Sequence, residues 1–336
     1  MAILETFYKM FFKKHGEKSD HFDGSAFFNY DKKLSQKSFL DVLKWRFQSK
    51  KKPWPKEKVR DNLYPDLESL VPENGYRVTF VNHATVLVQF AGVSILTDPV
   101  LLETIAPFGI VRRYRDPGIK IQDLPPIDFV LISHNHYDHL DLPTVKELGR
   151  NRHTTFLLPL GVKRYFPREI LKTNQFVEMD WWQEYKKNDL RITFVPAQHW
   201  SKRGIFDTNK SLWGGFIIKH REQTIFFAGD TGFGSHFNLI SQKFPNIDLA
   251  MLPIGAYEPR WFMKEAHMNP EDAVEAALIL KATTAMGIHF GTFNFSDEGI
   301  NDPEKDLALV LQNKKLDPSF FWVPKNGESH SIELFS

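Results

Sequence analysis

A polar stretch of nine residues, Ser133-His-Asn-His-Tyr-Asp-His-Leu-Asp141, constrains this chain more than any other feature of its sequence. It directly follows the apolar run Phe-Val-Leu-Ile at 129–132, which begins after Pro126 and Asp128. A short apolar run bounded in this way predicts a buried strand. The polar stretch is then the loop that leaves the C-terminal end of that strand, where side chains converge easily on one point.

The residue types in this loop indicate metal binding. Imidazole nitrogens and carboxylate oxygens suit zinc, manganese or iron. The spacing of His134, His136, Asp138 and His139 can direct the first two toward one ion and the last two toward a second ion. Such a loop is typical of a two-metal hydrolase. The alternative is a polar loop with hydrogen-bonded histidines, which rarely gathers this many ligands by chance.

Cysteine is absent from the 336 residues, which excludes disulfides, a thiolate nucleophile and a cysteine-type zinc site. Histidine and carboxylate remain as the strong metal ligands. The 43 basic and 41 acidic residues give a net charge of +2, so no global field favours nucleic acid and we expect no nucleic-acid partner. With 42% hydrophobic residues the chain can bury a sizeable core, in one large domain or two average ones.

The N-terminal part of the chain predicts peripheral structure. Segment 1–14 is apolar with lysines at its end, is too short to span a bilayer and does not resemble a secretory signal, so we expect a cytoplasmic protein. An amphipathic helix here would dock on the body of the protein or lie in a membrane interface as a peripheral contact. Residues 20–58 predict an irregular arm wrapped on the core. The lysines at 50–52 indicate a solvated loop, with anionic lipid headgroups as the alternative contact.

From Tyr76 onward the pattern predicts alternating strands and helices. Strands are expected over 76–81, 85–90, 93–97, 129–132, 155–158, 175–179, 190–196, 213–219, 224–228, 248–253 and 284–288. Helices are expected over 143–150 and 235–243, with a short helical piece over 162–166. Another helix is expected to begin at Asn269, a capping residue followed by Pro270. Two blocks of strands followed by helices predict an α/β fold with two sheets packed face to face and helices outside.

Three further candidate ligands stand where the chain leaves an apolar strand: His199, Asp230 and His289. Taken singly, each is more often a hydrogen-bonded histidine or a turn aspartate. Together with the loop they complete the donor set that a dinuclear site requires.

This set resembles the metallo-β-lactamase superfamily, whose fold is a four-layer αββα sandwich with a dinuclear site at one edge. The resemblance implies two divalent ions, for which the ligand types favour zinc. It also implies that one ion is held by His134, His136 and His199, and the other by Asp138, His139 and His289, with Asp230 bridging. We expect residues 1–75 to form the N-terminal arm and residues 76–336 to form the metallo-β-lactamase-like domain.

Two more residues resemble positions of the superfamily that support the ligands. Asp98, in Thr97-Asp-Pro99, would orient a ligand histidine, although a turn residue at a strand end is the alternative. His83 fits a similar supporting position, and the equally favoured alternative is a core histidine that is hydrogen-bonded to the backbone.

Longer motifs are similar to those of the N-acyl-phosphatidylethanolamine-hydrolysing phospholipase D family and its bacterial relatives. These motifs are 133–141, Asp180-Trp-Trp182, Gln198-His-Trp200, Gly229-Asp-Thr-Gly232, Pro253-Ile-Gly-Ala-Tyr-Glu-Pro-Arg-Trp-Phe-Met263 and His289-Phe-Gly-Thr-Phe293. The arm motifs Asp20-His-Phe-Asp-Gly24 and Phe28-Asn29 look like the bacterial branch. The resemblance implies a phospholipid substrate and hydrolysis of N-acylated phosphatidylethanolamine to an N-acylethanolamine and phosphatidic acid.

The same resemblance suggests catalytic roles. Asp138 or Asp230 would orient the attacking water and accept its proton. His267 would donate to a phosphate oxygen or protonate the leaving group, with a capping-turn histidine as the alternative. Arg260 and Tyr257 could bind phosphate, but a structural arginine paired with Glu258 is the favoured interpretation.

Other functions remain open at this stage. A hydrolase of the same fold could act on a lactone, a phosphorylated lactone or a cyclic nucleotide. In the redox di-iron proteins that this fold resembles, the metal loop has a glutamate where this chain has His136. A non-catalytic scaffold of this fold would be expected to have lost at least one of the seven ligands. A broad nuclease would need a basic track, whereas the dense basic run 50–52 lies in the arm.

Overall fold

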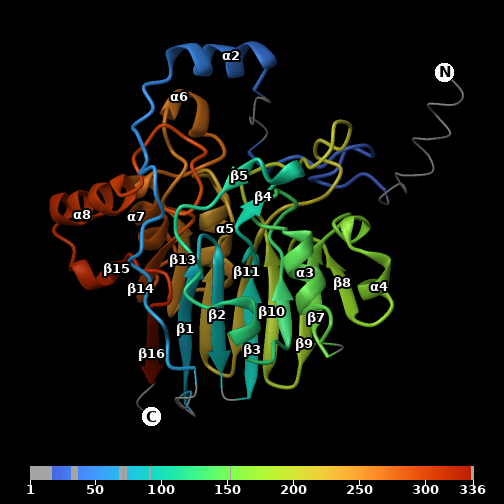
Figure 1. Ribbon diagram of the computed structural model, residues 1–336. Helices are drawn as coiled ribbons and strands as arrows, with labels where there is room; N and C mark the ends of the chain where they lie inside the picture. The colour runs from blue at the N-terminus through green and yellow to red at the C-terminus, as the bar shows by residue number, and fades with distance from the viewer. Residues whose placement is uncertain are drawn as a thin grey trace, which may run out of the picture.

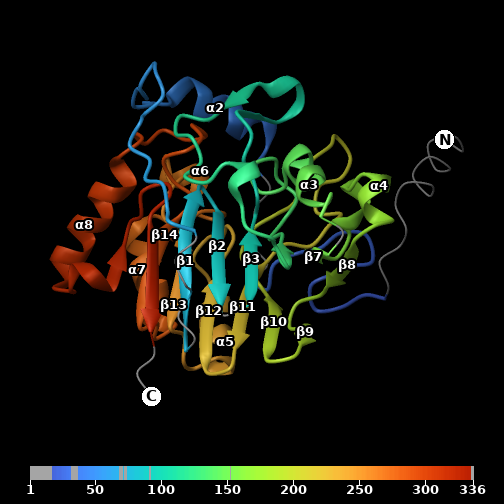
Figure 2. The same cartoon turned by 60° about the horizontal axis from the view of Figure 1, so that its bottom comes forward.

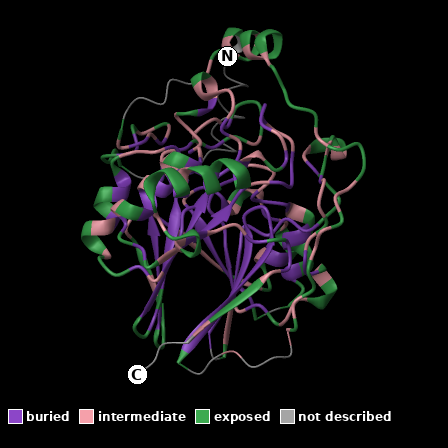
Figure 3. Ribbon diagram, turned by 90° about the vertical axis from the view of Figure 1, so that its left-hand side faces the viewer, coloured by how far each residue is buried: buried purple, intermediate pink, exposed green. Residues whose placement is uncertain are grey.

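The computed structural model describes residues 17–31, 37–67, 71, 74–90, 92–151 and 153–333, which fold into four layers. Two seven-stranded sheets pack face to face, and helices cover their outer faces (Figure 1). The four-layer αββα sandwich expected from the sequence is therefore confirmed. In Figure 3 the strands are mostly buried, whereas exposed residues gather on the helices and outer loops.

The first sheet has the order β16-β1-β2-β3-β6-β7-β8. Its strands are β1 (Gly75–Asn82), β2 (Thr85–Phe90), β3 (Val93–Thr97), β6 (Phe129–Leu131), β7 (Thr155–Pro159), β8 (Gln175–Met179) and β16 (Ser329–Glu333). The predicted meander is present as the antiparallel strands β1 to β3, after which β3, β6, β7 and β8 run parallel. Helices α3 (Leu142–Leu148) and α4 (Arg168–Leu171) cover its outer face.

The second sheet has the order β15-β14-β13-β12-β11-β10-β9. Its strands are β9 (Glu184–Lys187), β10 (Leu190–Val195), β11 (Gly215–His220), β12 (Gln223–Phe227), β13 (Leu249–Pro253), β14 (Thr284–Ile288) and β15 (Phe321–Trp322). Its outer face is covered by α5 (His236–Lys243), α7 (Pro270–Ile279) and α8 (Asp302–Lys314). Helix α7 begins as predicted, because Asn269 accepts a hydrogen bond from Asp272 N in a capping box.

The central core lies between the two sheets. One cluster combines inward residues of the first sheet, such as Phe80 and Phe129, with inward residues of the second, such as Phe194 and Phe216. Side chains that alternate to the other face, such as Leu96, pack against the helices instead. Burial on both faces explains why these strands read as long apolar runs. Burial of each large apolar side chain contributes about 1.5–3 kcal/mol before the entropy of ordering is subtracted.

Several elements lie outside the sequence-based predictions. Helix α2 (Phe39–Gln48) interrupts the arm that was expected to be irregular, and its capping box, formed by Ser38 and Asp41, is a signal the prediction missed. The loop after β3 contains a short hairpin of β4 (Thr104–Ile105) and β5 (Val111–Arg112), with a 3-10 turn, η1 (Pro107–Gly109), between them. Short helices α4, α6 (Arg260–Met263), η2 (Ile121–Asp123) and η4 (Pro318–Phe320) were also not expected, whereas η3 (Lys163–Tyr165) lies within the short helical piece predicted over 162–166.

The predicted helix at 1–14 lies outside the described residues. Among those that are described, no helix is both long and apolar enough to cross a bilayer.

Candidate metal centre

All seven predicted ligands come together where the chain leaves the strands. The 134–139 loop follows β6, and His199, Asp230 and His289 follow β10, β12 and β14. Because β3 and β6 run parallel, as do β12, β13 and β14, their C-terminal ends deliver loops to one edge of the sandwich. Five of the seven are buried, whereas His136 and Asp138 are partly exposed, so the cluster lies beneath the surface with two members facing outward.

One group of donor atoms consists of His134, His136 and His199, whose ligand atoms lie within 4.8 Å of one another. His136 Nδ1 lies 2.8 Å from His134 Nε2 and 3.2 Å from His199 Nε2. These are the three residues that the resemblance assigned to the first ion.

A second group consists of Asp138, His139 and His289, and it also includes His83. Asp138 Oδ2 lies 3.1 Å from His83 Nε2, 3.3 Å from His289 Nε2 and 3.5 Å from His139 Nε2. His83 sits in the turn between β1 and β2, and its carbonyl accepts a hydrogen bond from His289 N. His83 therefore faces the cluster directly through Asp138, not the backbone as in the alternative considered from the sequence.

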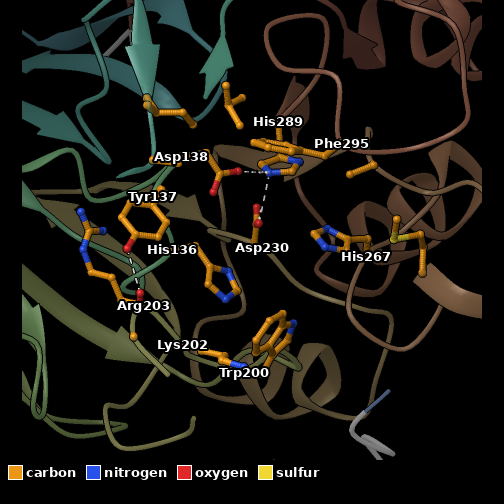
Figure 4. Close-up of a pocket in the computed structure, with 16 residues that line it drawn as sticks. His136, Tyr137, Asp138, Trp200, Lys202, Arg203, Asp230, His267, His289 and Phe295 are labelled. Atoms are coloured by element: carbon orange, nitrogen blue, oxygen red, sulfur yellow. Dashed lines mark hydrogen bonds and ion pairs between the residues drawn. The ribbon is translucent and has the colours of Figure 1, made fainter. Parts of the chain in front are cut away.

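Asp230 lies between the two groups. Its Oδ2 is 3.0 Å from His139 Nε2 and 3.1 Å from His289 Nε2, and it is 3.9 Å from both His134 Nε2 and His199 Nε2. Figure 4 shows the Asp230 carboxylate at the centre of the site, beside His289. This position suits a carboxylate shared by two ions.

Hydrogen bonds on the far side of each ring set which nitrogen carries the proton. His199 Nδ1 donates to Ala266 O at 3.0 Å, and His139 Nδ1 donates to Asp98 Oδ2 at 2.7 Å. Ser133 Oγ donates to the same Asp98 oxygen, so it accepts from His134 Nδ1 at 2.9 Å. Each of these rings then turns the lone pair of Nε2 toward the cluster.

Asp98 is the supporting residue that the sequence suggested. It is fully buried, and its two oxygens accept from Ser133 N, Ser133 Oγ and His139 Nδ1. The charge of Asp98 therefore orients His139 directly and His134 through Ser133.

The protonation states agree with a ligand cluster. Burial alone would raise the pKa of Asp230, but the charges of His139 and His289 hold the pKa of that carboxyl well below its usual range. The pKa of His134 lies well below its ordinary value because of burial and the neighbouring imidazoles. Ionised carboxylates and neutral imidazoles are the forms that bind a cation. Burial alone would lower the pKa values of His139 and His289, but Asp230 and Asp138 raise the pKa of His289 to about 9 and that of His139 well above its usual value, so a bound cation would replace a proton on each of these two rings.

The donor set fits divalent cations. Lone pairs of several imidazoles and the charges of two carboxylates converge on one volume, an arrangement that only positive charge stabilises. Within the described chain, four buried atoms of the seven ligands have no hydrogen-bond partner: His136 Nε2, His139 Nε2, Asp230 Oδ1 and His289 Nδ1. Buried polar atoms of this kind are rare unless something outside the chain satisfies them.

A cavity of about 430 Å³ opens over the cluster. Asp138, Asp230 and His267 are among its lining residues, and His267 stands across the site from Tyr137 and Arg203 in Figure 4. The ring centre of His267 lies 5.2 Å from that of His199. Burial lowers its pKa to about 4, so its imidazole is neutral at pH 7. Its side chain therefore faces the site, as one of the two sequence-based alternatives supposed.

Arg260 is structural, as the favoured interpretation supposed, but its expected partner was wrong. Its guanidinium pairs with Asp272 at 2.6 Å and donates to His267 O at 3.0 Å, whereas its contact with Glu258 is made by its backbone N–H. Arg260 thus fixes the backbone of His267 instead of binding phosphate. Tyr257 donates to Asp306 and is not among the residues that line the cavity.

Asn29 is a supporting residue that sequence reasoning did not assign. It lies in the arm, yet its amide brackets the backbone of His199, donating to His199 O at 2.9 Å and accepting from His199 N at 3.0 Å. Its oxygen also accepts from Trp213 Nε1. The quoted motif Phe28-Asn29 carried this signal, but no local pattern reveals a partner 170 residues away.

Most of the cavity wall was also missed. The apolar lining includes Ile105, Val111, Trp200, Met263 and Phe295. Trp200 stands edge-on to His136, with ring centres 4.5 Å apart.

Comparison with known proteins agrees with this geometry. A family model described as the β-lactamase superfamily domain matches residues 94–290. The chain is 40% identical over 285 residues to N-acyl-phosphatidylethanolamine-hydrolyzing phospholipase D 1 of Caenorhabditis elegans, covering 80% of each protein. It is 34% identical over 235 residues to the mitochondrial N-acyl-phosphatidylethanolamine-hydrolyzing phospholipase D of Saccharomyces cerevisiae, covering 66% of this chain and 49% of that protein.

A solved structure supports the fold. The metallo hydrolase of Ignicoccus hospitalis superposes with a TM-score of 0.58 at 21% identity, over 78% of this chain and all of that one.

Proposed function

This chain belongs to the N-acyl-phosphatidylethanolamine-hydrolysing phospholipase D family within the β-lactamase superfamily, and we propose that it cleaves the phosphodiester of N-acylated phosphatidylethanolamine. The products would be an N-acylethanolamine and phosphatidic acid. The observation that carries the proposal is a His and Asp cluster on the floor of a largely apolar cavity, in a metal-dependent hydrolase whose relative is named for this reaction.

The metal ligands in this proposal are His134, His136 and His199 for one ion and Asp138, His139 and His289 for the other, with Asp230 shared. We propose zinc, because His and Asp donors without thiolates suit it. When bound, the ions supply a nucleophile from water at neutral pH and positive charge for the phosphodiester.

The side chains of the cavity would do the rest. Asp138 and Asp230, both ionised, can accept the proton of the attacking water. His267 is a neutral imidazole whose Nδ1 has no hydrogen-bond partner among the described residues. A pKa of about 4 makes it a hydrogen-bond donor to a phosphate oxygen rather than a proton source for the leaving group. Trp200 and Phe295 offer apolar surface for the lipid chains.

The test is one substrate panel with mass spectrometry of the products. It compares N-acylated phosphatidylethanolamine in mixed micelles with bis-p-nitrophenyl phosphate, a cyclic nucleotide, a lactone and a cephalosporin. We expect N-acylethanolamine and phosphatidic acid, lost in Asp230→Ala and reduced in His267→Ala. Preference for the lactone by tenfold in kcat/KM, about 1.4 kcal/mol of transition-state discrimination, would assign the protein to another substrate class.

Metal content is tested separately. We expect two zinc ions per chain by metal analysis, and loss of activity after chelation and dialysis. Full activity with one ion or none would contradict the dinuclear site.

A further inference from the structure

Two loops that line the cavity carry large apolar side chains that no other part of the described chain covers. Phe108 and Ile110, on the turn between β4 and β5, have exposed fractions of 101% and 75%. Ile205 and Phe206, in the loop after His199, are 81% and 77% exposed. None of the four lines the cavity itself.

Both loops nevertheless form the cavity mouth. Ile105, Ala106 and Val111 of the hairpin line the cavity, and so do Lys202 and Gly204 of the second loop. The four exposed side chains therefore stand within a few residues of the entrance to the candidate metal centre.

The backbone of the hairpin turn holds Phe108 outward. Phe108 has a φ of 61°, in the left-handed region that a bulky residue rarely adopts. The next residue, Gly109, is also left-handed, and a Cβ there would lie 2.8 Å from Thr104 Oγ1, so the turn is tight. A strained turn that displays an aromatic ring to water gives the folded chain no packing in return, which points to a contact outside the chain.

Helix α2 extends the same face. It packs on α6 through Trp45 and Phe262, whose ring centres are 4.8 Å apart, and it leaves Leu40 and Phe47 exposed. Figures 1 and 2 both place α2 and the β4–β5 hairpin at the same end of the molecule, above the sheets. Leu40 and Phe47 are seven residues apart, so they share one side of the helix.

Basic side chains accompany these apolar tips. Arg112 follows the hairpin turn, Lys202 precedes Ile205 in the second loop, and Lys44 lies on α2; all three are exposed. Apolar tips rimmed by cations match the interface of a bilayer with net negative charge. Tips on separate loops also suit a lipid surface, which closes around each one, better than a flat protein surface.

We propose that the docking face, made of the 106–112 turn, the 202–206 loop and α2, seats the cavity mouth on an anionic phospholipid bilayer. The inference deepens the proposed function, because a lipid substrate has to pass from a bilayer into the cavity. It differs from the expectation that segment 1–14 makes the membrane contact.

The experiment measures sedimentation of the full chain with vesicles of phosphatidylcholine, with and without phosphatidylglycerol. The test variant is Phe108→Asn with Phe206→Ser, because asparagine tolerates a left-handed backbone. The matched control is Leu309→Ser with Leu278→Ser, two exposed leucines on α8 and α7. We expect the test variant to lose at least about tenfold in vesicle partitioning and the control to stay within about twofold of wild type.

Two further measurements make the result decisive. Arg112→Gln with Lys44→Gln should remove the preference for anionic vesicles while leaving the thermal unfolding midpoint in place. Hydrolysis of bis-p-nitrophenyl phosphate, which needs no bilayer, should be unchanged in the Phe108/Phe206 variant and shows that it has folded.

Equal vesicle binding by wild type and the Phe108/Phe206 variant would overturn the proposal. So would a wild-type dimer that this variant dissociates, which would make the face an interface between two copies. Vesicle binding is scored without turnover, so inactivity toward N-acylated phosphatidylethanolamine would refute the proposed function and leave the binding result standing.

Discussion

Replacing Asp98 with asparagine removes a buried negative charge beneath His139 while nearly preserving the shape of the side chain. Asp98 is fully buried, and its Oδ2 lies 2.7 Å from His139 Nδ1 and 2.5 Å from Ser133 Oγ. Its φ of 32° lies in the left-handed region, where asparagine is among the most readily accepted residues. The substitution therefore changes electrostatics with little strain.

Asparagine at position 98 cannot make all the hydrogen bonds that Asp98 makes. Asparagine has one oxygen, so it cannot accept from both Ser133 N and His139 Nδ1 as Asp98 does. With its amide nitrogen toward His139, donor would face donor. His139 relieves this by moving its proton to Nε2, the nitrogen that lies 3.0 Å from Asp230 Oδ2, and the lone pair needed for a metal is lost.

The expected magnitude is about 10–100-fold in zinc affinity. A hydrogen bond to a charged group contributes about 1.5–3 kcal/mol. Replacing the residue that orients a metal ligand typically lowers the metal affinity by about 10–100-fold. Competition with a chromophoric chelator measures the affinity, and turnover of bis-p-nitrophenyl phosphate measures the consequence.

Asp141→Asn is the matched control. Asp141 is also buried and lies in the same loop, but it caps α3 by accepting from Thr144 N and Thr144 Oγ1. We expect its zinc affinity to match wild type. If Asp98→Asn also binds two zinc ions within about twofold of wild-type affinity, the tautomer argument is refuted.

Three further predictions concern stability. Burial lowers the pKa of His236 to about 3, so between pH 6.5 and 3 the native side chain stays neutral while the unfolded one becomes protonated. The free energy of unfolding, which is highest above pH 6.5, should therefore fall by about 1.4 kcal/mol per pH unit between pH 6.5 and 3. Denaturant titrations of His236→Gln should show a shallower slope there, and an unchanged slope would contradict this. Burial alone would lower the pKa of His21, but its hydrogen bonds to Asp180 and Asp20 raise the pKa overall. The His21→Gln variant should therefore lose most stability below pH 6.5, and its deficit relative to wild type should shrink as the pH rises through the raised pKa. A deficit that does not change with pH would exclude the ion pair. A Cβ at Gly232 would lie 2.2 Å from Glu265 O, so Gly232→Ala should displace the backbone segment that leads to the cavity. We expect the free energy of unfolding to fall by about 1–3 kcal/mol, measured by thermal unfolding. An unfolding midpoint equal to that of wild type would show that the backbone accommodates the methyl group without strain.

The candidate ligands were accessible to sequence reasoning because each one carries a local signal. The 134–139 loop follows an apolar strand, and His199, Asp230 and His289 each follow another. A strand end marks a place at the edge of a sheet, and parallel strands bring such ends together. The structure shows that the seven residues meet, whereas their binding of two ions stays a prediction.

Other parts of the site depend on contacts between distant segments. Asn29 of the arm reaches the backbone of His199, and His83 reaches Asp138 from the turn between β1 and β2. The partner predicted for Arg260 was wrong because its nearest acidic neighbour in sequence, Glu258, is not the carboxylate that its guanidinium meets in space.

The sequence by itself determined the strand and helix pattern from β1 to β14 in outline, the two-sheet architecture and the donor set, because these follow from periodicity, caps and strand-end motifs a few residues long. The tertiary structure decided that the C-terminal strand β16 crosses back to pair with β1 in the first sheet, with Tyr76 opposite Ile332. It also decided that α2 stands at the same end of the molecule as the β4–β5 hairpin, whose residues Ile105 and Val111 line the cavity. Such placements depend on which distant surfaces bury one another best, and that free energy belongs to pairs of segments that no local pattern describes.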